Sequence, residues 1–331
     1  MEGRSFPGMD REMNKNILIG IGCLLLALAM ALHSSQVDFP KLTGPYLGQK
    51  PPGEIAQPFA VDVFSRYRGV HSNVFFSPDG NEAYWQSDIG DGSNYQGIFI
   101  SKSENGIWTN PQVAPFSSLA KGGLDDAPFI SPDGEKFFFL SGRPMKEGDQ
   151  SGKYNIWMMK RTGDGWSCPQ PLPQIVNSIT GMHWRLSVDR KGNLYFGTWK
   201  PHNDGNKVTG NIYCSRYKDG EYSIPEKLGP EVNVSVYNRS PFIAPDGSYL
   251  IFTGSEPPRL NILYICFRRN DGTWTKAKDL TNIIGRDGGC PIVISDGKYL
   301  FFLDTLDGKP KPFWMEAGFI ETLRKTESDI I

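Results

Sequence analysis

The sequence has almost no net charge, only four histidines and none of the short motifs that mark common enzyme classes. Its 35 lysines and arginines nearly balance its 36 aspartates and glutamates, which gives a formal net charge of −1. That balance removes the general electrostatic argument for binding nucleic acid or an anionic lipid surface. The chain contains no nucleophile elbow, phosphate-binding loop or dinucleotide fingerprint. We therefore expect no nucleic-acid partner and no cofactor, and no familiar motif marks an enzyme.

Long apolar runs are missing beyond the first 36 residues, where one stretch from Ile17 to Leu32 stands out. The mean hydropathy of −0.38 argues against a protein with many membrane spans. Lys15 precedes the apolar run, and Ala29-Met30-Ala31 has the form of a cleavage site, as in a secretory signal peptide. An uncleaved membrane anchor is the alternative, although the run is short for a bilayer span. We expect residues 1–36 to be a signal peptide or anchor, and the protein to be exported to the periplasm or the cell exterior.

A single pattern recurs five times along the rest of the chain: a hydrophobic run, a tight acidic turn closed by glycine, and a second hydrophobic run. The copies read VFFSPDGNEAYW, PFISPDGEKFFF, LSVDRKGNLYFG, PFIAPDGSYLIF and PIVISDGKYLFF. Their closing glycines are Gly80, Gly134, Gly192, Gly247 and Gly297, which lie 54, 58, 55 and 50 residues apart. A period in this range is typical of a β-propeller or a similar array.

Each copy divides into four strands. The turn separates the first two, and Asp-Gly suits a two-residue hairpin because glycine tolerates the positive φ required there. A third strand follows a longer polar loop, as in GIFIS (97–101) and NIWMM (155–159), and a second glycine turn leads to an aromatic fourth strand, as in NGIW (105–108) and DGTW (271–274). Four antiparallel strands repeated radially make a β-propeller. We predict an all-β fold of five four-stranded blades, with six blades as the alternative.

The fifth copy lacks a fourth strand at its C-terminal end. The segment EIAQPFAVDVF supplies one from the N-terminal side, because Ile55 and Pro58 repeat the spacing between the fourth-strand aromatic residues and the prolines that follow them. Pairing the two ends in one blade would close the ring and remove its open edges. We therefore expect a linker over 37–54, the propeller over 55–318, and a C-terminal tail with a short helix over 319–331.

The repeat resembles the Pro-Asp-Gly family, the TolB-like or WD40-like propellers of bacterial exported proteins. The resemblance rests on SPDG at 77–80 and 131–134, on APDG at 244–247, and on the glycine–aromatic strands, and it covers residues 55–315. The third copy (Asp189 to Gly192) and the fifth (Ser295 to Gly297) depart from the full motif but keep the turn glycine. The resemblance implies a fold more than an activity, because such propellers host many functions.

Cysteine is scarce in the repeats. The four cysteines beyond the N-terminal segment are Cys168, Cys214, Cys266 and Cys290, and their spacing fits neither a disulfide framework nor a zinc site. Because Cys214 and Cys266 occupy equivalent positions in successive copies, we expect buried free thiols, although the sequence does not settle their disulfide status. It is equally silent on the oligomeric state.

The positions nine and eight residues before each turn glycine should form a ring at one mouth of the central channel. The first set is His71, Asp125, His183, Asn238 and Gly288, and the second is Ser72, Asp126, Trp184, Arg239 and Gly289. The loops between second and third strands open on the same face, and they carry Trp85, Asp88, Arg143, Lys146, Trp199, Lys200, His202, Glu256 and Asp304. Binding residues concentrate on loops that a rigid scaffold holds. The predicted ligand-binding residues are His71, Asp125, Asp126, Arg143, His183, Trp184, Trp199 and Arg239.

Three functions remain open for this mouth face. The leading interpretation is an exported, non-enzymatic propeller that binds a protein or a glycan there. The second is a carbohydrate-active hydrolase or lyase, because two acids about 6.5–9.5 Å apart suffice for an inverting glycosidase; its candidates are Asp125, Asp126, Glu256 and Asp304. The third is a structural module of an envelope assembly.

A metal ion would require His71, Asp125 and His183 to converge, although hydrogen-bonding roles suit such isolated histidines better. For the binding interpretation we expect Asp125→Ala, Arg143→Ala and Trp199→Ala to weaken binding and to leave thermal stability nearly unchanged.

Overall fold

The computed structural model describes residues 39–67, 70–88, 96–117, 124–146, 148–149, 152–163, 165–179, 181–201, 208–327 and 330. Residues 1–41 and 42–331 form two separate compact units. The predicted signal peptide or anchor, residues 1–36, lies outside the described residues. No helix among the residues that are described is long and apolar enough to cross a membrane.

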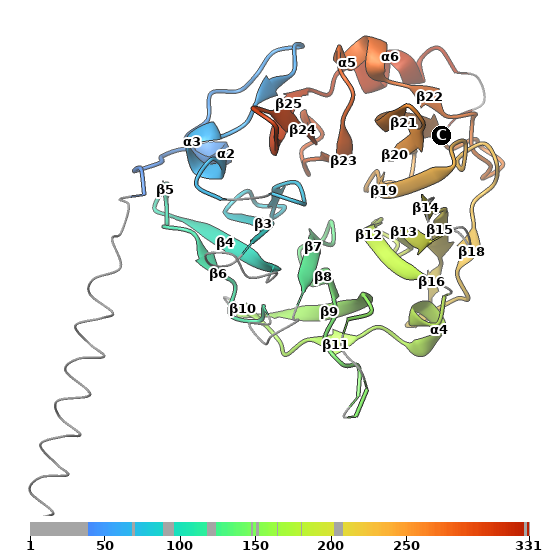
Figure 1. Ribbon diagram of the computed structural model, residues 1–331, viewed down its shortest axis with the longest axis horizontal. Coiled ribbons are helices and arrows are strands. Elements are labelled where there is room, and N and C mark those ends of the chain that lie inside the picture. The colour runs from blue at the N-terminus through green and yellow to red at the C-terminus, as the bar shows by residue number, and fades with distance from the viewer. Residues whose placement is uncertain are drawn as a thin grey trace, which may run out of the picture. The chain divides into compact units, whose positions relative to one another are not determined.

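Residues 42–331 form a five-bladed β-propeller, as predicted (Figure 1). Blade 1 consists of β2 (Phe75–Phe76), β3 (Glu82–Asp88), β4 (Gln96–Glu104), β5 (Ile107–Trp108) and β6 (Gln112–Val113). Blade 2 consists of β7 (Asp125–Ile130), β8 (Lys136–Ser141), β9 (Asn155–Thr162), β10 (Gly165–Trp166) and β11 (Gln170–Pro171). Blade 3 consists of β12 (Met182–Val188), β13 (Leu194–Pro201), β14 (Val208–Thr209), β15 (Ile212–Ser215) and β18 (Glu226–Lys227), with a separate ribbon of β16 (Tyr217–Lys218) and β17 (Glu221–Tyr222).

The remaining blades follow the same order of antiparallel strands. Blade 4 consists of β19 (Tyr237–Ile243), β20 (Tyr249–Glu256), β21 (Arg259–Phe267) and β22 (Lys278–Asp279). Blade 5 consists of β23 (Gly289–Val293), β24 (Tyr299–Leu306), β25 (Lys309–Glu316) and the N-terminal strand β1 (Gln57–Pro58). Short helices lie between or beside the blades: α2 (Pro45–Gly48), α3 (Val61–Phe64), α4 (Gln174–Asn177), α5 (Thr281–Ile284) and α6 (Phe319–Arg324). Helix α6 lies in the segment for which the sequence predicts a short helix.

The acidic turns are structural, as the turn chemistry indicates. The Oδ1 atom of Asp79 accepts hydrogen bonds from the Ser77 hydroxyl at 2.5 Å and from the Asn81 amide at 3.1 Å, and Gly80 has a φ of +74°. Asp133 accepts the same pair of bonds from Ser131 and Glu135. An aspartate that satisfies its own turn fixes the hairpin between the first two strands.

In blades 1 and 2 the fourth strand differs from the prediction, because it is broken into two pieces. In blade 1 the aromatic piece β5 pairs with the end of β4, and β6 pairs with β4 farther along. In blade 2, β10 and β11 divide in the same way along β9. The break falls at Pro111 and Pro169, which have no N–H to donate to a ladder. The predicted fourth strands end near these prolines, but the piece that completes each sheet begins after the proline.

Strand β1 closes the ring by pairing with β25, Gln57 opposite Trp314 and Pro58 opposite Phe313. The closing segment is therefore the predicted one, but its register is not. Its Gln57–Pro58 corresponds to the second outer piece of blade 2, Gln170–Pro171, so that Pro58 is not equivalent to the prolines at the break. The expected linker also folds in part, because the Trp108 amide donates to the Leu42 carbonyl at 3.0 Å.

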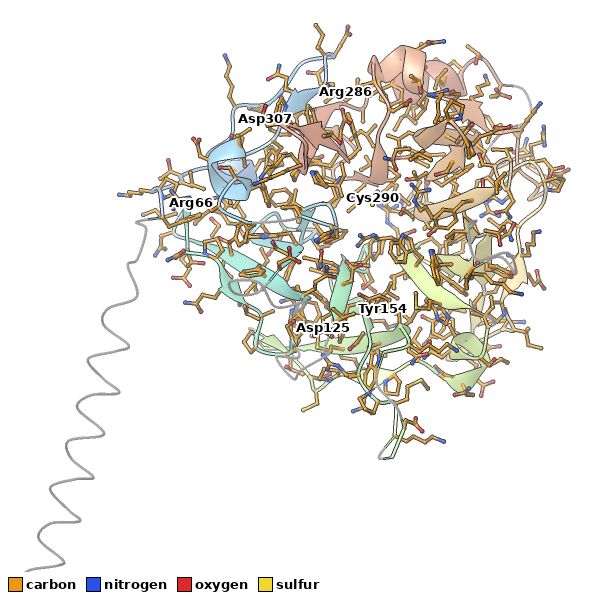
Figure 2. The ribbon with its side chains drawn as sticks, in the orientation of Figure 1. Arg66, Asp125, Tyr154, Arg286, Cys290 and Asp307 are labelled. Carbon is orange, nitrogen blue, oxygen red and sulfur yellow. The ribbon has the colours of Figure 1, made fainter. Side chains whose placement is uncertain are left out.

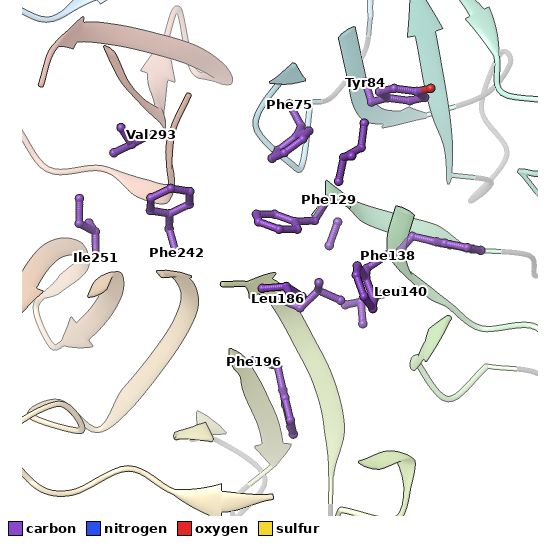
Figure 3. Close-up of a cluster of buried hydrophobic side chains, with 14 of the residues drawn as sticks. Phe75, Tyr84, Phe129, Phe138, Leu140, Leu186, Phe196, Phe242, Ile251 and Val293 are labelled. Carbon is purple, nitrogen blue, oxygen red and sulfur yellow. The ribbon is translucent and has the colours of Figure 1, made fainter. Parts of the chain in front are cut away.

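The blades are held together by aromatic seams and by a core in the middle of the ring. Figure 3 shows side chains from all five blades turned toward one another, and the rings of Phe75 and Phe129 lie 4.9 Å apart. Between blades 1 and 2, the Trp166 indole N–H donates to the Tyr84 hydroxyl at 3.0 Å, and the Arg161 guanidinium lies 3.8 Å from the centre of the indole ring. The predicted fourth-strand aromatic residue of blade 2, Trp166, is thus a packing residue of the seam.

Removing the Phe59 ring tests the closure. Phe59 is 1% exposed, lies 5.0 Å from both Phe301 and Trp314, and its amide donates to the Pro312 carbonyl at 2.8 Å. We expect Phe59→Ala to lower the free energy of unfolding by about 3–5 kcal/mol, because it leaves a cavity in the closing blade. Ile55→Ala, at a side chain that is 80% exposed, is the control and should have little effect in the same urea titration. A loss below about 1 kcal/mol for Phe59→Ala would contradict this role for the closing segment.

Candidate functional site

The central channel is closed to ligands. Its cavity holds about 30 Å³ and is lined by residues of all five blades, among them Asn73, Ala127, Arg185, Ser240 and Cys290. This volume corresponds to roughly one water molecule. Any ligand at this end of the ring therefore binds across the mouth of the channel rather than inside it.

A bulge at the entrance of the inner strand positions the mouth residues. Ala127, Arg185, Ser240 and Cys290 each lie seven residues before their turn glycine and have φ between 50° and 54°. The strand register shifts around these positions in blades 2 to 5. Such φ values are uncommon for residues other than glycine, and a bulge turns side chains away from simple alternation. The channel therefore receives Arg185 and Cys290, which the sequence analysis missed because neither residue type signals a left-handed position.

Arg185 connects three blades at the mouth. Its side chain donates to the Asp126 carboxylate of blade 2 and to the His71 carbonyl of blade 1. Arg185 is 8% exposed and Asp126 is 5% exposed. Burial opposes the charged form of Arg185, but the Asp126 carboxylate, together with Cys290 and Tyr154, raises the pKa of Arg185 above its ordinary value. One ion pair thus joins three blades at the channel entrance.

Asp125 and Arg143, both predicted ligand-binding residues, form a second ion pair on blade 2. The Arg143 Nη2 atom lies 2.8 Å from Asp125 Oδ2, and the Ser117 hydroxyl donates to the same oxygen at 3.0 Å. Asp125 is fully buried. Arg143 also lies about 5 Å from the ring centres of Phe139 and Trp157 (5.1 and 5.3 Å). The sequence analysis expects Asp125→Ala and Arg143→Ala to leave thermal stability nearly unchanged. Because the pair is buried, we now expect either change to destabilise the protein.

His183 is not presented at the mouth. It is fully buried, and its two ring nitrogens lie 3.2 Å from the Tyr154 carbonyl and 3.1 Å from the Val176 carbonyl. Burial lowers the pKa of His183 to about 4, although the two carbonyls act in the opposite direction. His183 therefore positions the chain between blades 2 and 3.

The metal hypothesis gains no support from the arrangement of these groups. His71 is exposed and lies 3.3 Å from Asp88, whereas Asp125 and His183 are occupied elsewhere. Over the described part of the chain, no group of three histidine, cysteine, aspartate or glutamate side chains could hold a metal ion.

The candidate catalytic acids are likewise not gathered in one place. Asp304 lies 2.9 Å from Arg286, which Figure 2 shows on blade 5, apart from Asp125 and Tyr154 on blade 2. Glu256 is exposed and lies opposite Arg259 at the hairpin of β20 and β21. Asp125 and Asp126 are each bound by an arginine. No pair among these four is arranged as a free acid and a free base.

Apart from the exposed His71 on blade 1, the accessible residues of the predicted ring lie on blades 3 and 4. Trp184, Trp199 and Arg239 are half-buried. The Arg239 guanidinium donates to Ser255, to the Leu260 carbonyl and to Asn261 at 2.5–2.8 Å.

The other predicted loop residues fall in different places. Trp85 is fully buried within β3, Lys146 and Lys200 are exposed, and His202 lies outside the described residues.

Two further features escaped the sequence analysis. A cavity of about 660 Å³ lies between the outer strands of blades 1 and 2, lined by Lys102, Glu104, Phe116 and Trp166 among others. Of the cysteines, Cys214 and Cys266 are buried, as predicted, but Cys168 is exposed and Cys290 is partly exposed.

The burial of the Asp125–Arg143 pair predicts a stability effect. Arg143→Met would leave the Asp125 carboxylate buried without its guanidinium, and we expect the free energy of unfolding to fall by about 3 kcal/mol. Adding Asp125→Asn should restore part of the loss, because the buried charge is then removed. Arg190→Met, at an exposed turn of blade 3, is the control. Additive effects of the two single changes in urea unfolding would contradict a direct interaction.

His183 predicts a pH dependence of stability. Its pKa is about 4 when folded and about 6.5 when unfolded, so the unfolded state binds more protons between these values. Stability should be complete above about pH 6.5 and fall as the pH decreases toward 4, by roughly 3 kcal/mol from this residue. His183→Gln should lack this component when unfolding is followed from pH 7 to 4. An imidazole that titrates near pH 6.5 by NMR would contradict the assignment.

Known proteins resemble this chain only in structure. No family model matches the sequence, and no curated protein matches it. Among solved structures, TolB from Acinetobacter baumannii is 14% identical over 74% of this chain and 56% of its own, with a TM-score of 0.46. The endo-arabinase from Bacteroides thetaiotaomicron VPI-5482 is 13% identical over 76% of this chain and 95% of its own, with a TM-score of 0.48. A putative 6-phosphogluconolactonase from Bacteroides uniformis ATCC 8492 is 13% identical over 72% and 83%, with a TM-score of 0.41. The chain thus spans little more than half of the TolB structure.

Proposed function

We propose that the protein is an exported, non-enzymatic propeller that binds a macromolecular partner, a protein or a glycan, across the channel mouth. The observation that carries this proposal is the state of the mouth carboxylates. Asp126 is held by Arg185, and Asp125 is held by Arg143 and Ser117. A glycosidase needs one acid that gives a proton and one base that takes a proton. Carboxylates fixed in buried ion pairs are poorly suited to both tasks.

The mouth offers binding groups instead. Trp184, Trp199 and Arg239 are partly accessible on adjacent blades, and tryptophan, tyrosine and arginine are the side chains that most often dominate binding energy at interfaces. The closed channel agrees with a partner that covers the face rather than a small substrate that enters a pocket. The propeller supplies rigid strands on which these groups are fixed before the partner arrives, which lowers the entropic cost of binding.

Two matched tryptophan variants test the location of the site. The full-length protein is incubated with a panel of immobilised polysaccharides and peptides, and both retention and release of reducing ends are measured. We expect retention without release of reducing ends, and we expect Trp199→Ala to weaken retention at least tenfold. Trp166→Ala, at a half-buried indole in the cavity between blades 1 and 2, should retain the partner as well as the unchanged protein does.

Other outcomes are equally informative. Release of reducing ends that fails in Asp125→Asn would establish the hydrolase or lyase instead. Loss of retention in Trp166→Ala but not in Trp199→Ala would move the site to the cavity between blades 1 and 2. Retention that neither variant changes would contradict a mouth site.

A further inference from the structure

Among the described residues of the mouth, Arg239 carries a positive charge that no carboxylate pairs with. Arg185 and Arg239 lie on neighbouring blades, close enough for the charge of Arg185 to act on Arg239. Asp126 pairs with Arg185. For Arg239, the described residues supply only neutral oxygens, those of Ser255, Leu260 and Asn261.

Arg239 is held in a fixed but electrostatically unfavourable place. Its three acceptors fix the guanidinium, which lies 4.7 Å from the centre of the Tyr237 ring. Burial lowers the pKa of Arg239 below its ordinary value; Tyr237 and Cys290 oppose this, and the charge of Arg185 adds a smaller lowering. The Tyr237 hydroxyl is buried and has no hydrogen-bond partner among the described residues. A carboxylate bound here would relieve the repulsion between the two arginines and would form a charge-assisted hydrogen bond.

Apolar side chains surround this charge. Trp184 lies opposite Gly197 and Trp199 lies opposite Met182, so both indoles are on one face of the β12–β13 pair. That face meets blade 4 at Arg239, because a Cβ on Gly197 would lie 3.1 Å from the Arg239 Cα atom. The indoles and the guanidinium therefore belong to one surface.

Two exposed aliphatic residues of blade 4 are neighbours of this surface, Val236 in the chain and Leu260 through its backbone. Val236, which precedes Tyr237, is 52% exposed, and Leu260, whose carbonyl binds Arg239, is 61% exposed. We define the blade 3–4 surface as Arg185, Arg239, Trp184, Trp199, Tyr237, Val236 and Leu260.

We propose that the blade 3–4 surface binds an acidic, apolar peptide segment of a protein partner, with a glutamate or aspartate carboxylate at Arg239. This proposal rests on the proposed function and specifies its ligand. The unbalanced guanidinium requires a negative group, and the exposed Val236 and Leu260 favour leucine- or phenylalanine-like side chains beside it. An acidic polysaccharide would satisfy the charge, but it would leave these two aliphatic side chains uncovered.

The test uses the full-length protein and fluorescein-labelled decapeptides in which leucine and phenylalanine alternate with glutamate. A matched set carries glutamine in place of glutamate. By fluorescence anisotropy in 50 mM NaCl we expect the glutamate set to bind at least tenfold more tightly than the glutamine set. Raising the salt to 500 mM should reduce this preference, because screening weakens the charge interaction.

Variants assign the effect to the blade 3–4 surface. Arg239→Met should reduce binding of the glutamate set to the level of the glutamine set, and Arg239→Lys should restore part of it. Trp199→Ala should weaken both sets, because it removes apolar contact. Arg190→Met, on the turn at the far end of β12, should change nothing. Near-ultraviolet circular dichroism checks that each variant is folded.

The failures can be told apart. Equal binding of the two peptide sets, still dependent on Trp199, would overturn the acidic ligand and leave the mouth site standing. Binding of polygalacturonate but of no peptide, with the same dependence on Arg239, would overturn the peptide in favour of an acidic glycan. Peptide binding that survives both Arg239→Met and Trp199→Ala would overturn this surface, and absence of any peptide binding would overturn the proposal itself.

Discussion

The ion pair between Arg185 and Asp126 is the interaction on which the mouth of this propeller depends. A guanidinium from blade 3 reaches a carboxylate on blade 2 and a backbone carbonyl on blade 1, all within the entrance of a channel with room for about one water. A buried charge without its partner is costly, so these three blades are constrained to one spacing. The same ion pair occupies Asp126, which is one of the candidate catalytic acids. This contact therefore constrains how three blades meet at this end of the ring.

The repeat made the fold predictable because its signals are local. An aspartate and a glycine fix each turn through bonds within six residues, and strands that flank such turns pair with their neighbours almost of necessity. The count of five followed from the turn glycines alone. The closing strand was harder to place, since a two-residue strand carries little pattern. We aligned this strand on the aromatic residue that precedes the break in the outer strands. Pairing with the sheet begins again only after that break, so the predicted register was wrong.

The site was less predictable, and the reasons are specific. Asp125 and His183 are polar residues at a predicted rim position. Hydrogen bonds from Arg143 and Ser117 allow Asp125 to be buried, and the ring nitrogens of His183 lie against the Tyr154 and Val176 carbonyls, one of which can accept the N–H of the neutral ring. Such compensation depends on residues far away in sequence. Arg185 was missed because it lies in a bulge with a positive φ. The inward–outward alternation of side chains, from which we assigned strand faces, does not hold there. Trp184, Trp199 and Arg239 are half-buried, and their role as binding residues stays a prediction.

The divided outer strands have a consequence for how this protein behaves at high concentration. The perimeter of the ring presents pieces of only two residues each, such as β5 and β6 or β10 and β11, separated by proline-containing breaks. A foreign strand needs a longer run of free amides and carbonyls before it can pair stably. The outer edges of the blades are thus too short to pair with a strand of another chain. We therefore expect copies of the protein not to associate edge to edge through their sheets.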